Sequence, residues 1–543
     1  MNQMKRTTRA LAVVLPNLMA LLVAGEAQPQ TVGDSITLLT RAERSGYRET
    51  SRYADVMAFV EQVVEVSPLL HLTTMGYSME GRALPVVVVG DVDDASPEAV
   101  LATGKLRLYV QANIHAGEVC GKEAMQMLLR ALASGAHSEW LDSLVLLIVP
   151  NYNPDGNERV RLTNRRYQHG PVAGMGERAN AQGLDLNRDN MKLESPEAHS
   201  LVAFWNRYDP HIVMDLHTTN GTRHAYWLTY APPLHPNTDA GIIELARTQL
   251  LPQVTRALKA KYDWDYYYYG NLPWRGMDVE RGWYTFSHQP RYLTNYVGLR
   301  NRIGVLSEAY SYATFEERIL ATLRFVEEVA EVAYRHASAI RRVLDEADRA
   351  EIVGAELALR ATFQRSEQPV EILMGEVVEE RNPYTGLTML RRLDVRRPER
   401  MPEFGTFRPT ETERAPVAYL VPPDLENVLN LLDDHGIAWT RLEEPVRLRV
   451  ERFVIDSTTV AEREYQGHRQ RTLFGRYEET EMTIPAGTAV VPVEQRLGRL
   501  VFTLLEPRSD DGLANWNFLD AALEAAPYYP IVRTFRGSLT EGG

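Results

Sequence analysis

Short apolar runs alternate with amphipathic segments between about residues 30 and 345, and this alternation limits the fold more than any other feature of the chain. The apolar runs predict strands at 85–90, 106–112, 143–150, 211–216, 225–229 and 303–307. The segments between them have helical periodicity, at 119–134, 196–208, 238–262 and 315–337. Buried strands interleaved with helices imply an α/β fold with a largely parallel or mixed sheet flanked by helices. In such sheets, ligands collect at the carboxyl ends of the strands.

The pattern changes beyond residue 350 to strand-like runs broken by proline, glycine and aspartate. The runs at 371–379, 418–421, 446–455, 488–493 and 499–505 predict strands, and only 424–434 and 516–525 predict helices. A chain of 543 residues is also longer than one ordinary domain. We therefore expect a first domain over 30–350 and a separate β-rich domain of unknown role over 355–543.

The first 27 residues have the pattern of a secretory signal peptide. Lys5, Arg6 and Arg9 precede an apolar stretch at 10–24, and small residues follow at the expected cleavage site. The stretch is shorter than a spanning helix needs, although an uncleaved anchor is the alternative. We expect a secreted or periplasmic protein with no stable membrane insertion after cleavage.

Charge and cysteine content exclude several classes of partner and site. The formal net charge of −13 becomes −15 without residues 1–27, which argues against nucleic acid and anionic membranes as partners. Cys120 is the only cysteine, so neither an intramolecular disulfide nor a multi-cysteine zinc site can form. Its ordinary role is that of a small packing residue.

His115 and Glu118 are the first candidates for metal ligands. They lie three positions apart, where the strand at 106–112 gives way to a helix, and His217 ends another expected strand. A catalytic zinc typically takes three protein ligands and keeps one position open for water. Taken alone, His115 could be an ordinary loop histidine, and Glu118 a partner of the helix dipole.

Neighbouring motifs raise the significance of this pair. They are the sequences G-x-S-x-x-G-R at 76–82, N-P-D-G at 153–156, R-A-N-A-Q-G-L-D-L-N-R at 178–188 and D-L-H at 215–217. Together with H-A-G-E at 115–118, they closely resemble the zinc carboxypeptidase family, the carboxypeptidase A-like metallopeptidases. The resemblance covers about residues 45–335 and does not extend to 355–543.

The resemblance implies a role for each matching residue. His115, Glu118 and His217 would bind one Zn²⁺ per chain, and Asp185 would accept a hydrogen bond from the second ring nitrogen of His115. Asn187 and Arg188 would hold the terminal carboxylate of the substrate. Arg178 would face the scissile carbonyl and stabilise the oxyanion, with Arg165 and Arg166 as rivals.

Glu308 would be the catalytic base of this family. It closes the apolar run at 303–307, and a glutamate in a partly dry cleft can take a proton from the zinc-bound water and return it. The family also uses a mobile tyrosine upstream of this glutamate. Tyr284, Tyr292 and Tyr296 are all candidates, and Tyr296 is the preferred one.

The sequence therefore predicts an exported zinc metallocarboxypeptidase that hydrolyses the C-terminal bonds of peptides and proteins. One alternative keeps the zinc chemistry, as an amidase or peptidase on cell-wall peptides or an amino-acid deacylase. Another is a non-catalytic peptide-binding protein, in which the β-rich domain captures the partner. Side-chain specificity and oligomeric state cannot be read from the sequence.

Overall fold

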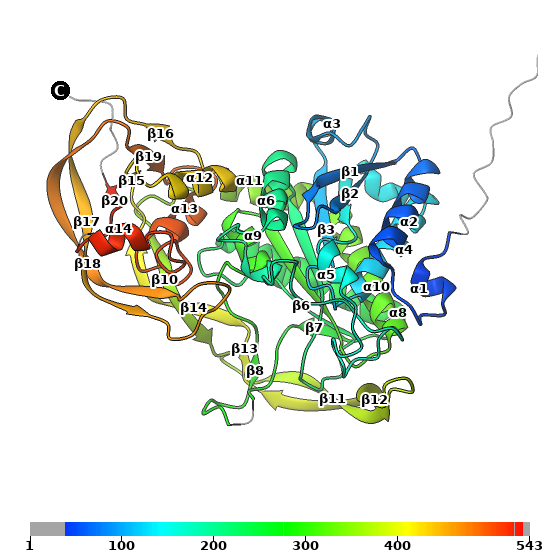
Figure 1. Cartoon of the computed structure of the whole chain (residues 1–543). Coiled ribbons are helices and arrows are strands. Elements are labelled where there is room, and N and C mark those ends of the chain that lie inside the picture. The colour runs from blue at the N-terminus through cyan, green and yellow to red at the C-terminus, as the bar shows by residue number, and fades with distance from the viewer. Residues whose placement is uncertain (1–37, 275, 526, 536–543) are drawn as a thin grey trace, which may run out of the picture. The chain divides into compact units, whose positions relative to one another are not determined.

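An eight-stranded mixed sheet forms the centre of the structure, in the order β1-β2-β4-β3-β5-β9-β6-β7 (Figure 1). This computed structural model describes residues 38–274, 276–525 and 527–535, so the predicted signal peptide lies outside the described residues. The pairs β3–β4, β3–β5, β5–β9 and β6–β7 are parallel, and the other neighbours are antiparallel. The strands are β1 (Leu70–Tyr77), β2 (Ala83–Val89), β3 (Leu106–Ala112), β4 (Leu144–Val149), β5 (Ile212–Thr218), β6 (Leu228–Ala231), β7 (Tyr266–Tyr268) and β9 (Ile303–Ala309).

Successive residues of β3 point into two different hydrophobic cores because side chains alternate across a sheet. Leu108 and Val110 pack in a core with residues of the helices on one face, and Tyr109 packs in a second core on the other face. The first face carries α2 (Tyr53–Glu65), α4 (Cys120–Ala133), α8 (Leu251–Tyr262), α10 (Phe315–Arg335) and α11 (Ala337–Asp348). The second carries α6 (Pro196–Tyr208) and α9 (Leu293–Leu299). The expected α/β fold with a mixed sheet flanked by helices is confirmed.

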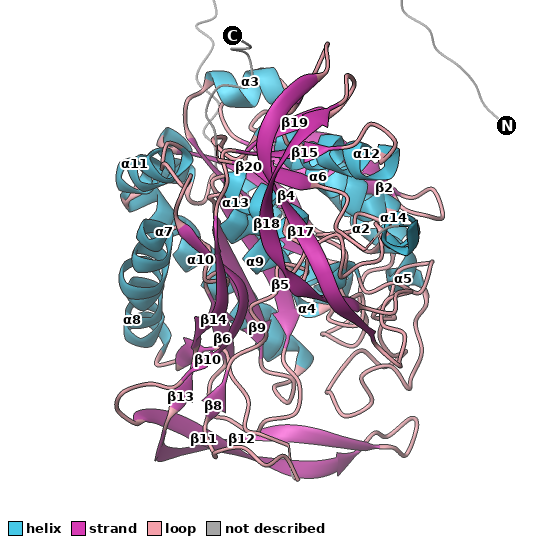
Figure 2. Cartoon of the chain, turned by 90° about the vertical axis from the view of Figure 1, so that its left-hand side faces the viewer, coloured by secondary structure: helices cyan, strands magenta, loops and turns pink. Residues whose placement is uncertain are grey.

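The C-terminal region, residues 355–535, is rich in strands, as the sequence predicts. Its largest sheet has the order β16-β19-β15-β20-β17-β18 and is antiparallel throughout. Its strands are β15 (Ala418–Val421), β16 (Thr440–Arg441), β17 (Val446–Val460), β18 (Arg471–Ile484), β19 (Ala489–Pro492) and β20 (Val532–Thr534). Figure 2 shows β17 and β18 as one long hairpin. The shorter pairs are β10 (Glu356–Gln364) with β14 (Thr406–Arg414), β11 (Val370–Arg381) with β12 (Thr388–Met401), and β13 (Glu403–Phe404) with β8 (Trp283–Tyr284).

The second hydrophobic core continues from the central sheet into the C-terminal region. It contains Leu201 of α6 together with Leu432 of α12 (Glu426–His435) and Phe502 of α13 (Gly498–Leu505). By their contacts, the described residues belong to one compact unit. Independent folding of residues 355–543 stays a prediction.

Two predicted elements of the C-terminal region differ from the structure. Residues 499–505, expected to be a strand, belong to the helix α13. All eight residues of α13 are buried. The pattern of a short, mostly apolar run cannot by itself separate a buried strand from a buried helix. The helix expected at 516–525 is shorter, because α14 spans Asp520–Ala525.

No helix among the residues described here is long and apolar enough to cross a membrane.

Asp209 joins the end of α6 to three arginines. It has a left-handed backbone (φ 43°), which stops the helix. Its carboxylate lies 2.9 Å from Arg302, 3.1 Å from Arg107 and 2.5 Å from Arg496, which belongs to the C-terminal region. Burial raises the pKa of Asp209, but the arginines outweigh it and lower the pKa to about 2.

This pKa predicts a pH-dependent contribution to stability. A carboxylate whose pKa is depressed on folding stabilises the protein above its unfolded-state pKa, and the contribution disappears as the pH falls through the folded-state pKa. Asp209→Asn, which also tolerates a left-handed backbone, should lower the free energy of unfolding by about 2 kcal/mol at pH 7. The difference from wild type should shrink below about pH 4. Urea unfolding at several pH values measures it, with Asp434→Asn, in a more exposed pair with His199, as the control. A difference that does not change with pH would contradict the prediction.

Candidate active site

Three neighbouring parallel strands bring the candidate ligands and the candidate base together. β5 pairs with β3 on one side and β9 on the other, so the carboxyl ends of all three meet at one edge of the sheet. His115 lies in the loop after β3, Glu118 just before α4, and His217 near the end of β5. Glu308 of β9 is the register partner of His217. Side chains of register partners share a face of the sheet, so these two groups lie side by side.

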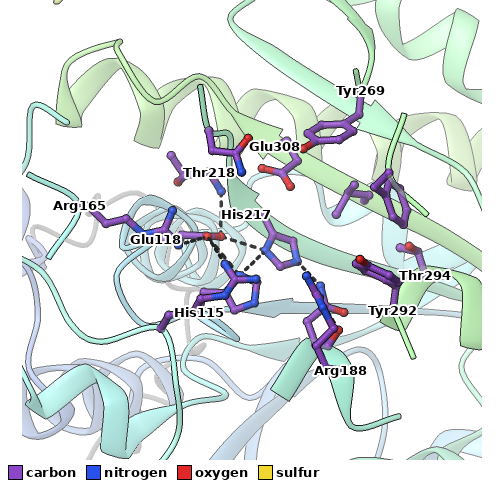
Figure 3. A pocket seen from close by; sticks show the side chains of 15 residues that line it. His115, Glu118, Arg165, Arg188, His217, Thr218, Tyr269, Tyr292, Thr294 and Glu308 are labelled. Carbon is purple, nitrogen blue, oxygen red and sulfur yellow. Dashed lines mark hydrogen bonds and ion pairs between the residues drawn. The ribbon is translucent and has the colours of Figure 1, made fainter. Parts of the chain in front are cut away.

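His115, Glu118 and His217 face one another in a buried cluster (Figure 3). Nδ1 of His217 lies 2.9 Å from Oε2 of Glu118 and 3.1 Å from Nδ1 of His115. Nδ1 of His115 lies 3.1 Å from Oε1 of Glu118. The backbone N–H of Thr218 also donates to Oε2 of Glu118, at 3.0 Å. Two ring nitrogens and a carboxylate therefore converge on one point.

A carboxylate holds the outer nitrogen of each histidine. Nε2 of His115 lies 2.9 Å from Asp185, and Nε2 of His217 lies 2.7 Å from Asp215. A ring that donates Nε2–H to a carboxylate leaves Nδ1 with a lone pair, which is the form a metal ligand needs. Because both Nδ1 atoms point at the same place as Glu118, the cluster fits a divalent zinc ion. Among the residues that the structure describes, no other such group could hold a metal.

The sequence motif D-L-H at 215–217 contains Asp215, but the sequence analysis gives this residue no role. Asp215 lies two residues before His217 on β5, so the two side chains lie on the same face of the strand. This two-residue spacing is the sequence signal that could have identified Asp215 as a partner of His217. Asp185 differs because it comes from a distant loop, where it precedes the short helix Leu186–Arg188 and accepts a hydrogen bond from the Asn187 N–H.

Glu308 projects into the same pocket and carries an oxygen without a protein partner. Its Oε2 is buried and makes no hydrogen bond with any residue that the structure describes. Burial raises the pKa of Glu308 to about 8, and the negative charge of Glu118 adds to the rise. Glu308 thus has the environment of a group that exchanges a proton with a bound molecule.

Two arginines approach the cluster, and they differ in their nearest acidic partner. Arg165 forms an ion pair with Oε1 of Glu118. Arg178 instead places Nε and Nη2 each 2.9 Å from Oδ2 of Asp185, and its Nη1 is 3.7 Å from Glu118. The side chain of Arg178 is 43% exposed, against 19% for Arg165. Arg165 therefore lies closer to Glu118 than Arg178 does, and Figure 3 shows Arg165 beside Glu118.

The pocket continues from this cluster to Asn187 and Arg188. Its volume is about 200 Å³, and its lining also includes Tyr269, Phe286 and Tyr292. The guanidinium of Arg188 lies 4.0 Å from the ring of Tyr292, and its Nη1 donates to the carbonyl of Asn187 at 2.6 Å. One pocket thus contains the three converging side chains of His115, Glu118 and His217 together with Glu308 and Arg188.

Comparison with known proteins agrees with this geometry. A family model described as zinc carboxypeptidase matches residues 56–209. "Carboxypeptidase 2" of Trichophyton tonsurans is 24% identical over 487 residues, which cover 84% of this chain and 81% of the relative. "Carboxypeptidase M" of Mus musculus is 31% identical over 138 residues, covering 24% and 28%.

Residues 56–209 belong to the zinc carboxypeptidase family, and relatives named carboxypeptidase align over most of the chain. The chain is accordingly a zinc-dependent metallopeptidase. Among solved structures, a metallo-carboxypeptidase from Burkholderia cenocepacia covers 52% of this carboxypeptidase and 68% of its own chain, with 18% identity and a TM-score of 0.39. Carboxypeptidase A from Helicoverpa armigera covers 54% and 75%, with 17% identity and a TM-score of 0.41.

The structure does not bring Tyr296, the tyrosine preferred from the sequence, into the pocket of this carboxypeptidase. Tyr296 is fully buried in the second hydrophobic core, where its hydroxyl lies 2.6 Å from Nδ1 of His435 and 3.1 Å from Nη1 of Arg300. The pattern of the segment around it could not show which tyrosine faces the cleft. Tyr292, one of the alternative candidates, lines the pocket, as does Tyr269. Tyr284, the third candidate, stacks on Phe404 instead.

Proposed function

We propose that this carboxypeptidase is exported and removes residues from the C-termini of peptides, with one zinc ion held by His115, Glu118 and His217. The observation that carries the proposal is the arrangement of the pocket. The ligand cluster and the unpartnered oxygen of Glu308 share it with Arg188, a fixed cation suited to a terminal carboxylate.

The residues of the pocket divide the chemistry between them. Zinc bound at the cluster would lower the pKa of a water molecule and polarise the scissile carbonyl. The Glu308 carboxylate accepts the proton of the attacking water and then donates it to the departing amine, which needs a base of raised pKa. Its register with His217 holds it beside the ligand cluster throughout.

Arg165 is our preferred residue for stabilising negative charge on the carbonyl oxygen. It reaches Glu118 and hence the metal site, whereas both Nε and Nη2 of Arg178 contact Asp185. This assignment replaces the preference for Arg178 drawn from the sequence. Arg178 would instead hold Asp185, which in turn orients His115.

Asn187 and Arg188 would bind the carboxylate of the terminal residue. Arg188 is mostly buried, so its attraction for an anion is weakly screened by water. Tyr269 and Tyr292, which line the pocket, are the tyrosines available to cover that residue.

The test compares matched peptides that end in a free carboxylate or in an amide. Purified residues 28–543 should contain one zinc per chain and release the terminal residue of the free acid about a hundredfold faster than that of the amide, since a charge-assisted pair would be lost. A chelator should abolish the release. Equal rates on both peptides would contradict carboxypeptidase action, and cleavage confined to cell-wall peptides would favour the amidase alternative.

Export rests on the basic and apolar pattern of residues 1–27. Full-length protein expressed with a secretion system should be recovered outside the cytoplasm with a new N-terminus near residue 28. Recovery of the uncleaved chain in the membrane fraction would support the anchor instead.

A further inference from the structure

The loop that joins β17 to β18 in the C-terminal region ends in a tight turn. Tyr465 and His468 exchange two backbone hydrogen bonds, of 2.8 and 3.1 Å. Between them, Gln466 and Gly467 both have positive φ, 52° and 79°. Two successive residues with positive φ are the mark of a type I′ hairpin turn, whose geometry is well defined. The side chains around this turn are therefore presented in fixed directions.

Three side chains of the turn contact the segment that carries the proposed carboxylate-binding residues. The hydroxyl of Tyr465 accepts a hydrogen bond from Nε of Arg188 at 2.9 Å. Oε1 of Gln466 accepts one from the backbone N–H of Asp185 at 2.8 Å. Nε2 of His468 lies 2.7 Å from a carboxylate oxygen of Glu194.

These contacts determine which edge of Arg188 remains available. Tyr292 covers one face of the guanidinium, Tyr465 takes Nε, and the Asn187 carbonyl takes one hydrogen of Nη1. Nη2 has no hydrogen-bond partner among the described residues. A guanidinium can bind a carboxylate bidentately through Nε and Nη2 or through its two terminal nitrogens. Because Nε is occupied, an incoming carboxylate must meet the terminal nitrogens.

Other residues of the C-terminal region contact the turn and hold it in place. The ring of Tyr465 stacks with Trp516, with centroids 6.3 Å apart. Arg291 lies 4.5 Å from the Trp516 ring and pairs with Asp511 at 2.8 Å. Arg291 directly precedes Tyr292, so the same group of contacts holds the residue that covers Arg188.

We propose that Tyr465 and Gln466 are positioning residues for Arg188, so that the C-terminal region completes the subsite for the terminal carboxylate of the substrate. This inference rests on the proposed carboxypeptidase activity. Tyr465 holds the orientation of the guanidinium, and Gln466 fixes the start of the Asp185–Arg188 segment.

The test uses Tyr465→Phe, which keeps the aromatic stack and removes the hydroxyl. With a free-acid peptide, KM should rise about tenfold because a hydrogen bond to a charged group is lost, while kcat changes less than about twofold. Tyr477→Phe is the matched control. It lies in the same hairpin and loses a hydroxyl contact with Glu506, at 3.0 Å, away from the pocket. A merely structural effect would appear in both variants.

Gln466→Asn provides a second variant, because asparagine tolerates positive φ while its shorter side chain withdraws from Asp185. It should raise KM in the same direction, and in both variants the preference for free acid over amide should fall. Unchanged KM and preference in Tyr465→Phe would overturn the inference. If that variant is less stable than Tyr477→Phe, unchanged KM in Gln466→Asn overturns it. Failure of the wild type to prefer the free acid would instead refute the proposed function.

Discussion

Glu308→Gln is expected to lose between about a hundredfold and ten-thousandfold in kcat, the usual range for removing a general acid–base group. The amide has nearly the shape of the carboxylate but cannot take a proton from water. Steady-state kinetics on a free-acid peptide, together with zinc analysis, measure the effect. The zinc content should stay the same, because Glu308 is not one of the three converging ligands.

The same change should not destabilise the fold. Burial already disfavours the charged form of Glu308, so a neutral side chain removes an unfavourable term. The melting temperature should therefore equal or exceed that of the wild type. Glu316→Gln, an exposed glutamate on α10, is the control and should keep full activity. Full activity in Glu308→Gln would refute the role of this residue as the base.

His217→Ala is expected to abolish zinc binding and reduce activity by roughly a thousandfold or more, since metal assistance is worth several kcal/mol. Two of three ligands would remain, and Asp215 would lose its buried partner. Zinc at 100 to 1,000 times its Kd should stabilise the wild type by about 3–4 kcal/mol. Calorimetry with and without chelator should show this difference in the wild type alone.

Asp215→Asn should weaken zinc binding less than His217→Ala does. It keeps all three ligands but weakens the hydrogen bond that orients His217, so zinc affinity should fall about 10- to 100-fold. His199→Ala, an exposed histidine on α6, should change nothing. Zinc binding by His217→Ala with wild-type affinity would mean that the cluster is not the metal site.

The central fold was predictable because its signals are local. Strands such as Leu106–Ala112 are mostly apolar and buried along their whole length, and the helices between them carry clear periodicity. The helix α13 was not predictable in this way, because a buried, mostly apolar run of eight residues fits a strand as well as a helix. The contacts between the turn at Tyr465 and Arg188 join residues 277 positions apart, and no local pattern reports such a pairing.

The residues of the candidate site also differ in how far the sequence predicts their positions. His115, Glu118, His217 and Glu308 follow or end strands that lie side by side, so their meeting follows from sheet topology. Arg165 and Arg178 sit on long connections, where spacing does not fix direction, and Tyr296 lies in the short helix α9 with Tyr292 just before it. The sequence therefore leaves Arg165, Arg166 and Arg178 as rivals, and the structure places both Arg165 and Arg178 in the pocket, together with Tyr292 but not Tyr296.

The register between β5 and β9 has a consequence for how this enzyme can change over time. His217 and Glu308 are coupled through the backbone ladder, and a slip of one residue would turn Glu308 to the opposite face of the sheet. The groups that would recognise the substrate lie instead on loops and on a turn from the C-terminal region. Substitutions in those loops and in that turn can therefore alter substrate preference while His217 and Glu308 keep their spacing.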